Sequence, residues 1–205
     1  MRIFFIIILL ISSMPFCIAQ DPDMQSAEKA VKLYLDMEAH HADDGYWQAE
    51  YNSLVIHQNN NWMGADCHYS CIPSAPKNFP KGDILFTSYS IVSSSIVNEH
   101  VDYTTDKKEK AIVFMVKYRA IASIGGSGFI FYNTPLDFIE YLIFSRDPLD
   151  KNFKLIDSVP SFRSHRMYGA QYYYDHLDNY IENKKQKNSF RNAYLEYLKN
   201  SKKQN

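Results

Sequence analysis

Two cysteines four positions apart, Cys67 and Cys71, have the most obvious capacity for chemistry in this chain. Together with Asp66 and His68 they could supply the roughly four N, S or O ligands that zinc takes. However, neighbouring residues of an extended loop point in opposite directions, and Cys67 and His68 are neighbours. The spacing fits neither a Cys-x-x-Cys redox motif nor the Cys-x-x-Cys-His order of haem attachment. The choice between a metal site and a disulfide therefore depends on the compartment.

The first residues of the chain predict export. Arg2 precedes an unbroken apolar run from Ile3 to Ile11, and Cys17-Ile18-Ala19 lies where a signal peptidase would cleave. This pattern is typical of a signal peptide over residues 1–19, and its apolar run is too short to cross a bilayer. We expect a periplasmic or secreted protein without a transmembrane anchor after cleavage. In such a compartment Cys67 and Cys71, the cysteines left after cleavage, should form a disulfide rather than a metal site.

Histidine and aspartate residues are the candidates for acid–base chemistry. His40 and His41 lie near the end of a predicted helix, close to Asp43 and Asp44. General acid–base catalysis needs such groups held in a cleft. Adjacent histidines cannot both face one pocket, however, and the end of a helix favours a protonated histidine through its dipole alone. This group therefore supports catalysis only weakly.

His100 and Asp102 form a second candidate pocket. They are two positions apart in a predicted strand, so both side chains should lie on one face, as an acid–base pair would require. The charged turn that follows them favours a solvated strand end instead. No Gly-x-Ser-x-Gly, His-Glu-x-x-His or phosphate-loop motif occurs. We therefore expect no cofactor and no metal, and a binding protein more than an enzyme.

Aromatic residues beside a glycine-rich stretch are the candidate partner contact. Phe129, Phe131 and Tyr132 follow Gly125–Gly128. At the tip of a hairpin, such side chains would be presented to a partner, and aromatic anchors dominate protein interfaces. The alternative is a bent strand whose phenylalanines alternate into the core.

Charge and length limit the functions open to the chain. Its 205 residues include 22 basic and 23 acidic ones, and Arg2 would leave with the leader. The mature chain would have the length of a single domain and a slight negative charge, which argues against general nucleic-acid binding. Basic residues concentrate in 184–205, so contact with an anionic envelope surface is a further, weaker possibility.

The order of the predicted elements indicates an α+β protein. A helix with one apolar face runs from Met24 to about Ala42, and a second short helix is plausible at 46–58, before a loop over 59–81. Strand-like runs follow at 83–103, 108–124, 137–147 and 152–162, with the glycine-rich stretch 124–135 interrupting the sheet and helices at 168–181 and 189–200 after it.

These elements predict N-terminal helices packed on a curved antiparallel sheet, in a cone-like domain over 20–167, with a C-terminal helical extension over 168–205. The first strand, at roughly 20 residues, is long enough to need a bulge that curls the sheet.

The helix with Val31, Tyr34 and Leu35, the strand KAIVFMVKYRA and the segments YLIFSRD and NFKLIDSVPSF resemble the nuclear-transport-factor-two-like cone fold. The resemblance spans about 27–161, and within that fold the chain is similar to small periplasmic proteins of unknown function, some of them immunity proteins against cell-wall amidases delivered by type VI secretion. It implies an exported, non-enzymatic binding protein, with an immunity-type inhibitor as the most concrete version, whose partner is a toxin, a cell-wall hydrolase or another envelope protein. The alternative is a cone that binds or transforms a small molecule with His100 and Asp102 at its mouth.

Overall fold

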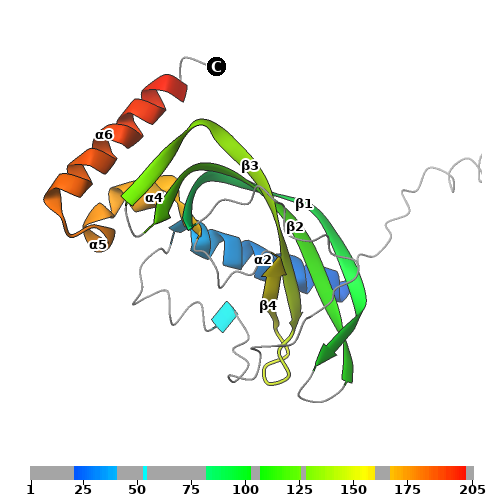
Figure 1. Cartoon of the computed structure of the whole chain (residues 1–205). Coiled ribbons are helices and arrows are strands. Elements are labelled where there is room, and N and C mark those ends of the chain that lie inside the picture. Colours follow the sequence, from blue (N-terminus) through cyan, green and yellow to red (C-terminus); the bar gives the residue numbers. More distant parts are fainter. Residues whose placement is uncertain are drawn as a thin grey trace, which may run out of the picture.

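The computed structural model describes residues 21–40, 53–54, 82–102, 107–125, 128–159 and 167–201. Its sheet has the strand order β4-β3-β2-β1-β5 and curls around one long helix (Figure 1). The elements are α2 (Pro22–His40), β1 (Asp83–Asp102), β2 (Lys107–Gly125), β3 (Gly128–Arg146), β4 (Phe153–Val159), β5 (Met167–Gly169), α4 (Ala170–Asp175), α5 (Leu177–Tyr180) and α6 (Lys184–Ser201). The predicted α+β class with a curved sheet is confirmed.

Helix α2 begins at a favourable sequence. Asp21 Oδ1 accepts a hydrogen bond from the backbone N–H of Asp23 at 2.8 Å, and Pro22 occupies the first helical position, where its missing N–H costs nothing. The predicted apolar face is buried in the hollow of the sheet, and its residues from Ala27 to Met37 are at most 7% exposed. This burial explains why α2 can form although its sequence includes several polar residues.

Bulges curl the sheet, as the length of β1 predicts. Strand β1 is 20 residues long and pairs with β2 along its whole length, and Thr87 and Val92 are extra residues without a counterpart in β2. Extra residues of this kind bend a strand and increase its twist.

A larger irregularity lies in β3, and one sequence prediction was wrong there. Ala120 pairs with Leu136 and Ala122 with Phe131, so the four residues Tyr132–Pro135 lie opposite Ile121 alone. The glycine-rich stretch was expected to interrupt the sheet, but Gly125 pairs with Gly128 and β3 continues unbroken through the irregularity to Arg146. A bulge is where a strand tolerates proline, which explains how Pro135 is accommodated.

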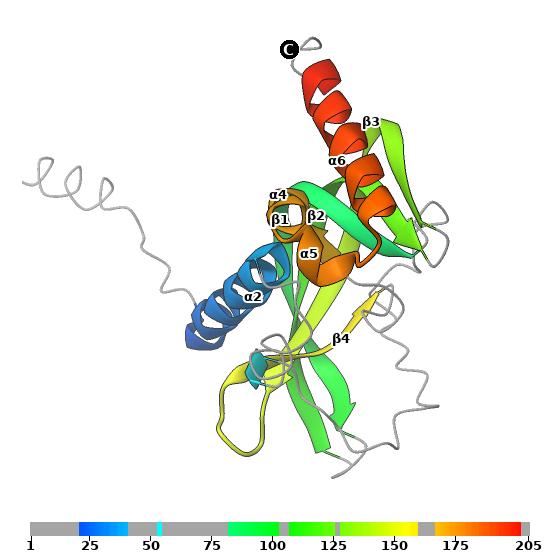
Figure 2. The same cartoon turned by 90° about the vertical axis from the view of Figure 1, so that its left-hand side faces the viewer.

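The two faces of the sheet carry separate cores. Between α2 and the sheet, Tyr118 stacks on Phe138 at 5.3 Å and Phe114 contacts Phe144 edge to face at 5.8 Å between ring centroids. On the opposite face, at one end of the sheet, Leu85 and Ile121 pack with residues of α4, α5 and α6. Figure 2 shows α6 rising past the end of the sheet on the side of β3.

The C-terminal part differs from the prediction in detail. The helix expected over 168–181 is divided at His176 into α4 and α5, and it is preceded by β5, which pairs parallel to β1 through Met167, Tyr168 and Gly169. The expected boundary after residue 167 thus falls inside β5. Helix α6 begins at Lys184, five residues before the predicted start. Among the described residues, no helix has both the length and the apolar character needed to span a membrane.

Candidate functional site

Several predicted site residues lie outside the described residues: Cys67 and Cys71, the leader over 1–19, and His41, Asp43 and Asp44. The disulfide and the leader therefore stay predictions. His40 is the last residue of α2, and its Nδ1 lies 3.0 Å from both the carbonyl oxygen and Oδ1 of Asp36. In the described ranges no cluster of His, Cys, Asp and Glu side chains is arranged to hold a metal ion.

His100 and Asp102 lie in β1 at the end nearest its turn to β2. Their backbones pair with Glu109 and Lys107 respectively, after an irregularity in register between Val97 and His100. The structure therefore places them in a strand, as predicted, at the end of β1 remote from its pairing with β5. It describes no side-chain geometry for either residue, so the predicted pocket stays a prediction.

The predicted aromatic contact residues lie in a strand and on both of its faces. The rings of Phe129 and Phe131 contact Phe190 of α6 at 4.9 and 5.4 Å between centroids. Tyr132 packs instead against the core that α2 covers. Phe129 and Phe131 are thus partly buried between the sheet and α6, which agrees with the alternative of a bent strand with alternating rings.

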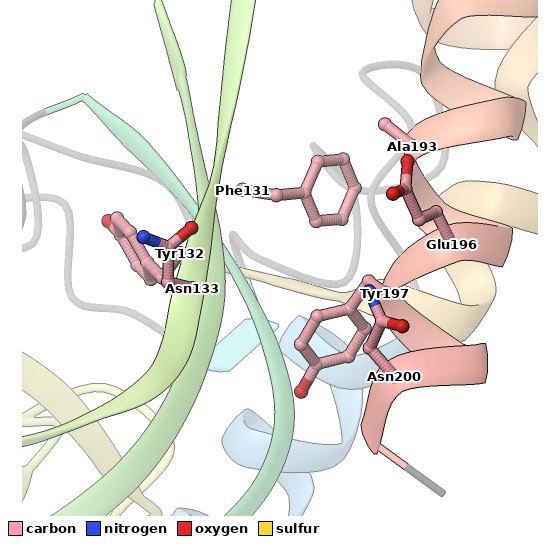
Figure 3. Close-up of a pocket in the computed structure, with 7 residues that line it drawn as sticks. All are labelled: Phe131, Tyr132, Asn133, Ala193, Glu196, Tyr197 and Asn200. Carbon is pink, nitrogen blue, oxygen red and sulfur yellow. The ribbon is translucent and has the colours of Figure 1, made fainter. Parts of the chain in front are cut away.

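A groove nevertheless lies beside these aromatic residues, between β3 and α6 (Figure 3). Its volume is about 500 Å³. Phe131, Tyr132 and Asn133 line it from β3, where the irregularity begins, and Ala193, Glu196, Tyr197 and Asn200 line it from α6. Figure 3 shows the Phe131 ring directed towards α6, and its centroid is 6.1 Å from that of Tyr197.

The spacing of the residues on α6 makes the groove elongated. Positions 193, 196, 197 and 200 form one stripe along two turns of a helix, about 10 Å long at 1.5 Å per residue. The groove combines half-buried aromatic rings, those of Phe131 and Tyr197, with exposed polar side chains, those of Asn133, Glu196 and Asn200. Burial raises the pKa of Tyr197, and Arg119 partly offsets this, so its hydroxyl stays protonated at neutral pH.

The edge of β3 beside the groove is open in the part of the chain that the structure describes. Strand β4 pairs with β3 only from Tyr141 to Arg146, so within the described ranges no strand pairs with that side of residues 128–137. An edge of this kind is where a further strand can add to a sheet.

A second set of functional groups lies in the interior, and the sequence reasoning missed it. Glu38 of α2 is 5% exposed and Glu140 of β3 is 1% exposed, inside the aromatic core. The hydroxyl of Tyr118 donates to Glu38 Oε2 at 3.1 Å. Burial, and next the charge of Glu140, raise the pKa of Glu38 well above its ordinary value, while hydrogen bonds from Tyr34 and Tyr118 work in the other direction. The net effect favours the protonated form of Glu38.

The sequence did contain signals for this pair. Glu38 follows Tyr34 by four positions on the apolar face of α2, and Glu140 alternates with Phe138 and Leu142 on the inward face of β3. An acidic residue in register with a buried face indicates either a partner or a raised pKa.

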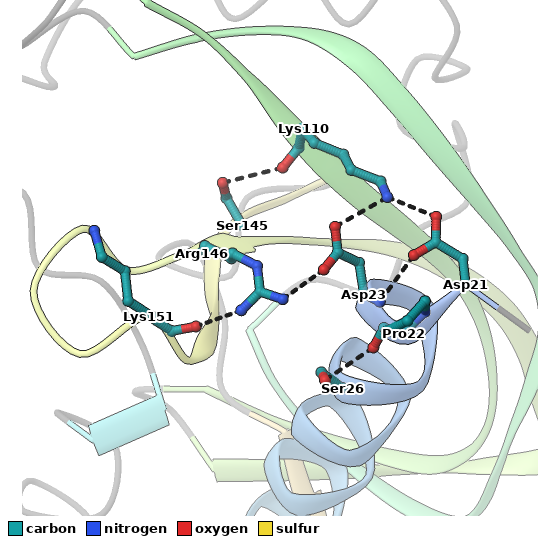
Figure 4. A network of polar contacts seen from close by, with 8 residues as sticks. All are labelled: Asp21, Pro22, Asp23, Ser26, Lys110, Ser145, Arg146 and Lys151. Carbon is teal, nitrogen blue, oxygen red and sulfur yellow. Dashed lines mark hydrogen bonds and ion pairs between the residues drawn. The ribbon is translucent and has the colours of Figure 1, made fainter.

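A network of ion pairs fixes the N-terminus of α2 to the sheet (Figure 4). Lys110 Nζ lies 2.7 Å from Asp21 Oδ2 and 3.0 Å from Asp23 Oδ2, and Arg146 Nη2 lies 2.5 Å from Asp23 Oδ1. Arg146 also donates to the carbonyl of Lys151. The hydrogen bonds from Arg146 and then Lys110 lower the pKa of Asp23. The two aspartates of the network are balanced by one lysine and one arginine. The network therefore serves to position α2.

Neither the family models, nor the curated proteins, nor the solved structures contain a match to this chain. Its function must therefore be argued from the groove, the interior and the charges described above.

Proposed function

We propose that this chain is an exported binding protein that holds an extended segment of a protein partner in the groove between β3 and α6. The observation that carries the proposal is the combination of the half-buried rings of Phe131 and Tyr197 with the open edge of β3 in one elongated hollow. Partly exposed aromatic side chains in a hollow are typical anchors of protein interfaces.

The dimensions of the groove fit a short peptide segment. Its stripe along α6 is about 10 Å long, the length of roughly three residues of extended chain at 3.3 Å per residue. Such a segment can pair with the backbone of β3 and place one apolar side chain against the rings of Phe131 and Tyr197. In recognition by strand addition, the backbone hydrogen bonds supply affinity and a side-chain pocket supplies specificity.

Export and partner class rest on the sequence. The leader over residues 1–19 supports a periplasmic or secreted location, and the resemblance to cone-fold immunity proteins supports an exported toxin or cell-wall hydrolase as the partner. The curled α+β sheet around α2 is consistent with that resemblance.

A second candidate function, acid–base chemistry inside the cone, draws support from the raised pKa of the buried Glu38 carboxyl group. Carboxyl groups with raised pKa values gather at catalytic sites. Glu38 and Tyr118 are 5% and 0% exposed, however, and aromatic rings fill the space between α2 and the sheet. A substrate could reach them only if α2 moved, so we favour the binding function.

The test is capture of a partner by the mature chain, with two matched substitutions in α6. Asn200→Trp places a bulky side chain in the groove, whereas Asn192→Trp makes the same change at an exposed position of α6 that does not line it. Against a panel of exported cell-wall hydrolases, we expect Asn200→Trp to weaken binding roughly tenfold or more and Asn192→Trp to bind as the parent does. Equal affinities for a bound hydrolase would show that the groove is not the contact.

A further inference from the structure

A separate hollow of about 660 Å³ lies where β5 diverges from β1. The last residue pair between these strands is Phe86 with Gly169, after which the chain enters α4 and β1 continues through the extra residue Thr87. The C-terminal end of α2, the residues after Phe86 in β1, helix α4 and Tyr194 of α6 surround this pocket. Its volume falls in the usual range for small-molecule sites, about 300–1,000 Å³.

Aromatic rings form much of the wall of this pocket. Phe86 and Tyr89 line it from β1, Tyr172 from α4 and Tyr194 from α6. Phe86 and Tyr89 contact each other edge to face, with ring centroids 6.2 Å apart. Four aromatic side chains from three elements thus converge on one space. The π faces of such rings attract cations.

A carboxylate stands at the rim and is held in place. Gln171 Nε2 donates to both carboxylate oxygens of Asp175, at 3.0 and 3.1 Å, and the hydroxyl of Tyr194 donates to Gln171 Oε1 at 3.2 Å. Tyr194 is 3% exposed, so this chain of hydrogen bonds links the rim to the buried wall. An ionised carboxylate has about four acceptor positions, which leaves Asp175 able to face a cation.

The other groups around the pocket also favour a positively charged ligand. Ala39 and His40, at the C-terminal end of α2, line the pocket, and the end of a helix carries partial negative charge. The residues that line the pocket include no lysine or arginine. Burial and then the charge of Asp175 raise the pKa of Tyr194, and burial followed by the charges of Asp36 and Glu38 raises that of Tyr89.

We propose that this pocket binds a small organic cation, of the alkylammonium class, with its charged group among the aromatic rings and facing Asp175. The proposal does not depend on the groove between β3 and α6, because the two sites are lined by different residues and different faces of α6. A cation bound here would contact α2, β1, α4 and α6 at once.

The test uses choline and its uncharged analogue of the same shape, 3,3-dimethylbutan-1-ol. Each is titrated into the full-length mature chain at low ionic strength and pH 8. Binding is followed through the NMR resonances of the tyrosine rings. We expect choline to bind roughly tenfold more tightly than the alcohol, because only choline gains the attraction to the rings and to Asp175.

Two isosteric variants separate the pocket from the general charge of the surface. Asp175→Asn should weaken choline binding by about fivefold or more, since it removes the carboxylate at the rim. Asp178→Asn makes the same change three residues further on, outside the pocket, and should leave the affinity unchanged. The proposal would be overturned if choline did not bind, if it bound no better than the alcohol, or if the two variants lost affinity equally. None of these outcomes bears on capture of a protein partner.

Discussion

Glu38 is a buried acidic residue among aromatic side chains. It lies on the apolar face of α2, accepts hydrogen bonds from the hydroxyls of Tyr34 and Tyr118, and faces the charge of Glu140 from β3. Because its folded-state pKa is raised, the folded state binds a proton more tightly than the unfolded chain does. The stability that this provides is complete below the ordinary value of about 4.5 and is lost as the pH rises through the folded-state pKa.

This linkage predicts an unusual effect of Glu38→Gln. The amide keeps the hydrogen bond from Tyr118 but cannot ionise, so the variant should be more stable than the parent at pH 8, by roughly 1–3 kcal/mol, and similar to it at pH 4.5. Urea unfolding at the two pH values measures the difference. The exposed Glu182→Gln serves as the control. If the stability of the parent relative to Glu38→Gln increased with pH, the raised pKa of Glu38 would be contradicted.

At the scale of elements, the arrangement of α2 against β5 depends on one glycine. A Cβ atom at position 169 would lie 2.1 Å from the carbonyl oxygen of Ala39, far inside contact distance. The backbone of β5 can therefore reach β1 beside the end of α2 only because residue 169 lacks a side chain. Since α4 begins at the next residue, this contact also sets the direction of α4 and one wall of the pocket beside β1.

Gly169→Ala should consequently destabilise the protein by about 2–4 kcal/mol, because either α2 or β5 must shift. Gly125→Ala provides the matched control, since a Cβ atom there would meet nothing within 4 Å. Thermal unfolding of the two variants measures the effect. Similar melting temperatures for both would show that α2 and β5 separate without cost.

Some elements could be predicted from the sequence because a periodic pattern marked them. The face of α2 from Ala27 to Met37 and the alternation of Ile112, Phe114, Val116 and Tyr118 in β2 each correspond to burial in the structure. The length of β1 likewise indicated its bulges. The three-residue strand β5 had no such mark, because a parallel pairing that short leaves no recognisable pattern and its residues continued the aromatic run of the next helix.

The candidate sites were harder to predict, because their residues come from elements that lie far apart in the sequence. Phe131 and Tyr132 stood out by their residue type, but their partners Ala193, Tyr197 and Asn200 come from a helix some sixty positions later and became visible only through the fold. Similarly, no sequence pattern connects Asp175 and Tyr194 with Phe86, and these residues meet because β5 places α4 beside β1. Residue types indicate where chemistry is possible, whereas long-range pairing decides which residues meet.

For the whole molecule, the C-terminal helices form part of the structure rather than an addition to it. Phe190 is 0% exposed and Tyr194 is 3% exposed, and they cover Phe129 and Phe131 of the sheet. The core on this face joins residues of β1, β2 and β3 to α4, α5 and α6. Packing on this face therefore continues across the expected division after residue 167, which lies inside β5.

Truncation after Asn183 tests this view. Removal of α6 would expose the apolar surface that Phe190 and Tyr194 cover, with an expected loss of about 3–5 kcal/mol from these two side chains. Truncation after Ser201, which leaves α6 complete, is the control. Chemical unfolding followed by circular dichroism measures both, and a shortened chain as stable as the parent would mean that α6 is an independent appendage.

The irregularity in β3 has one more consequence. Four residues of β3 stand against Ile121 alone, which is three more than regular pairing would need. Two of these four residues, Tyr132 and Asn133, line the groove. A homologous chain without these three extra residues would keep the same fold but would have a regular strand beside α6. Gain or loss of the proposed binding would therefore require only a small insertion or deletion.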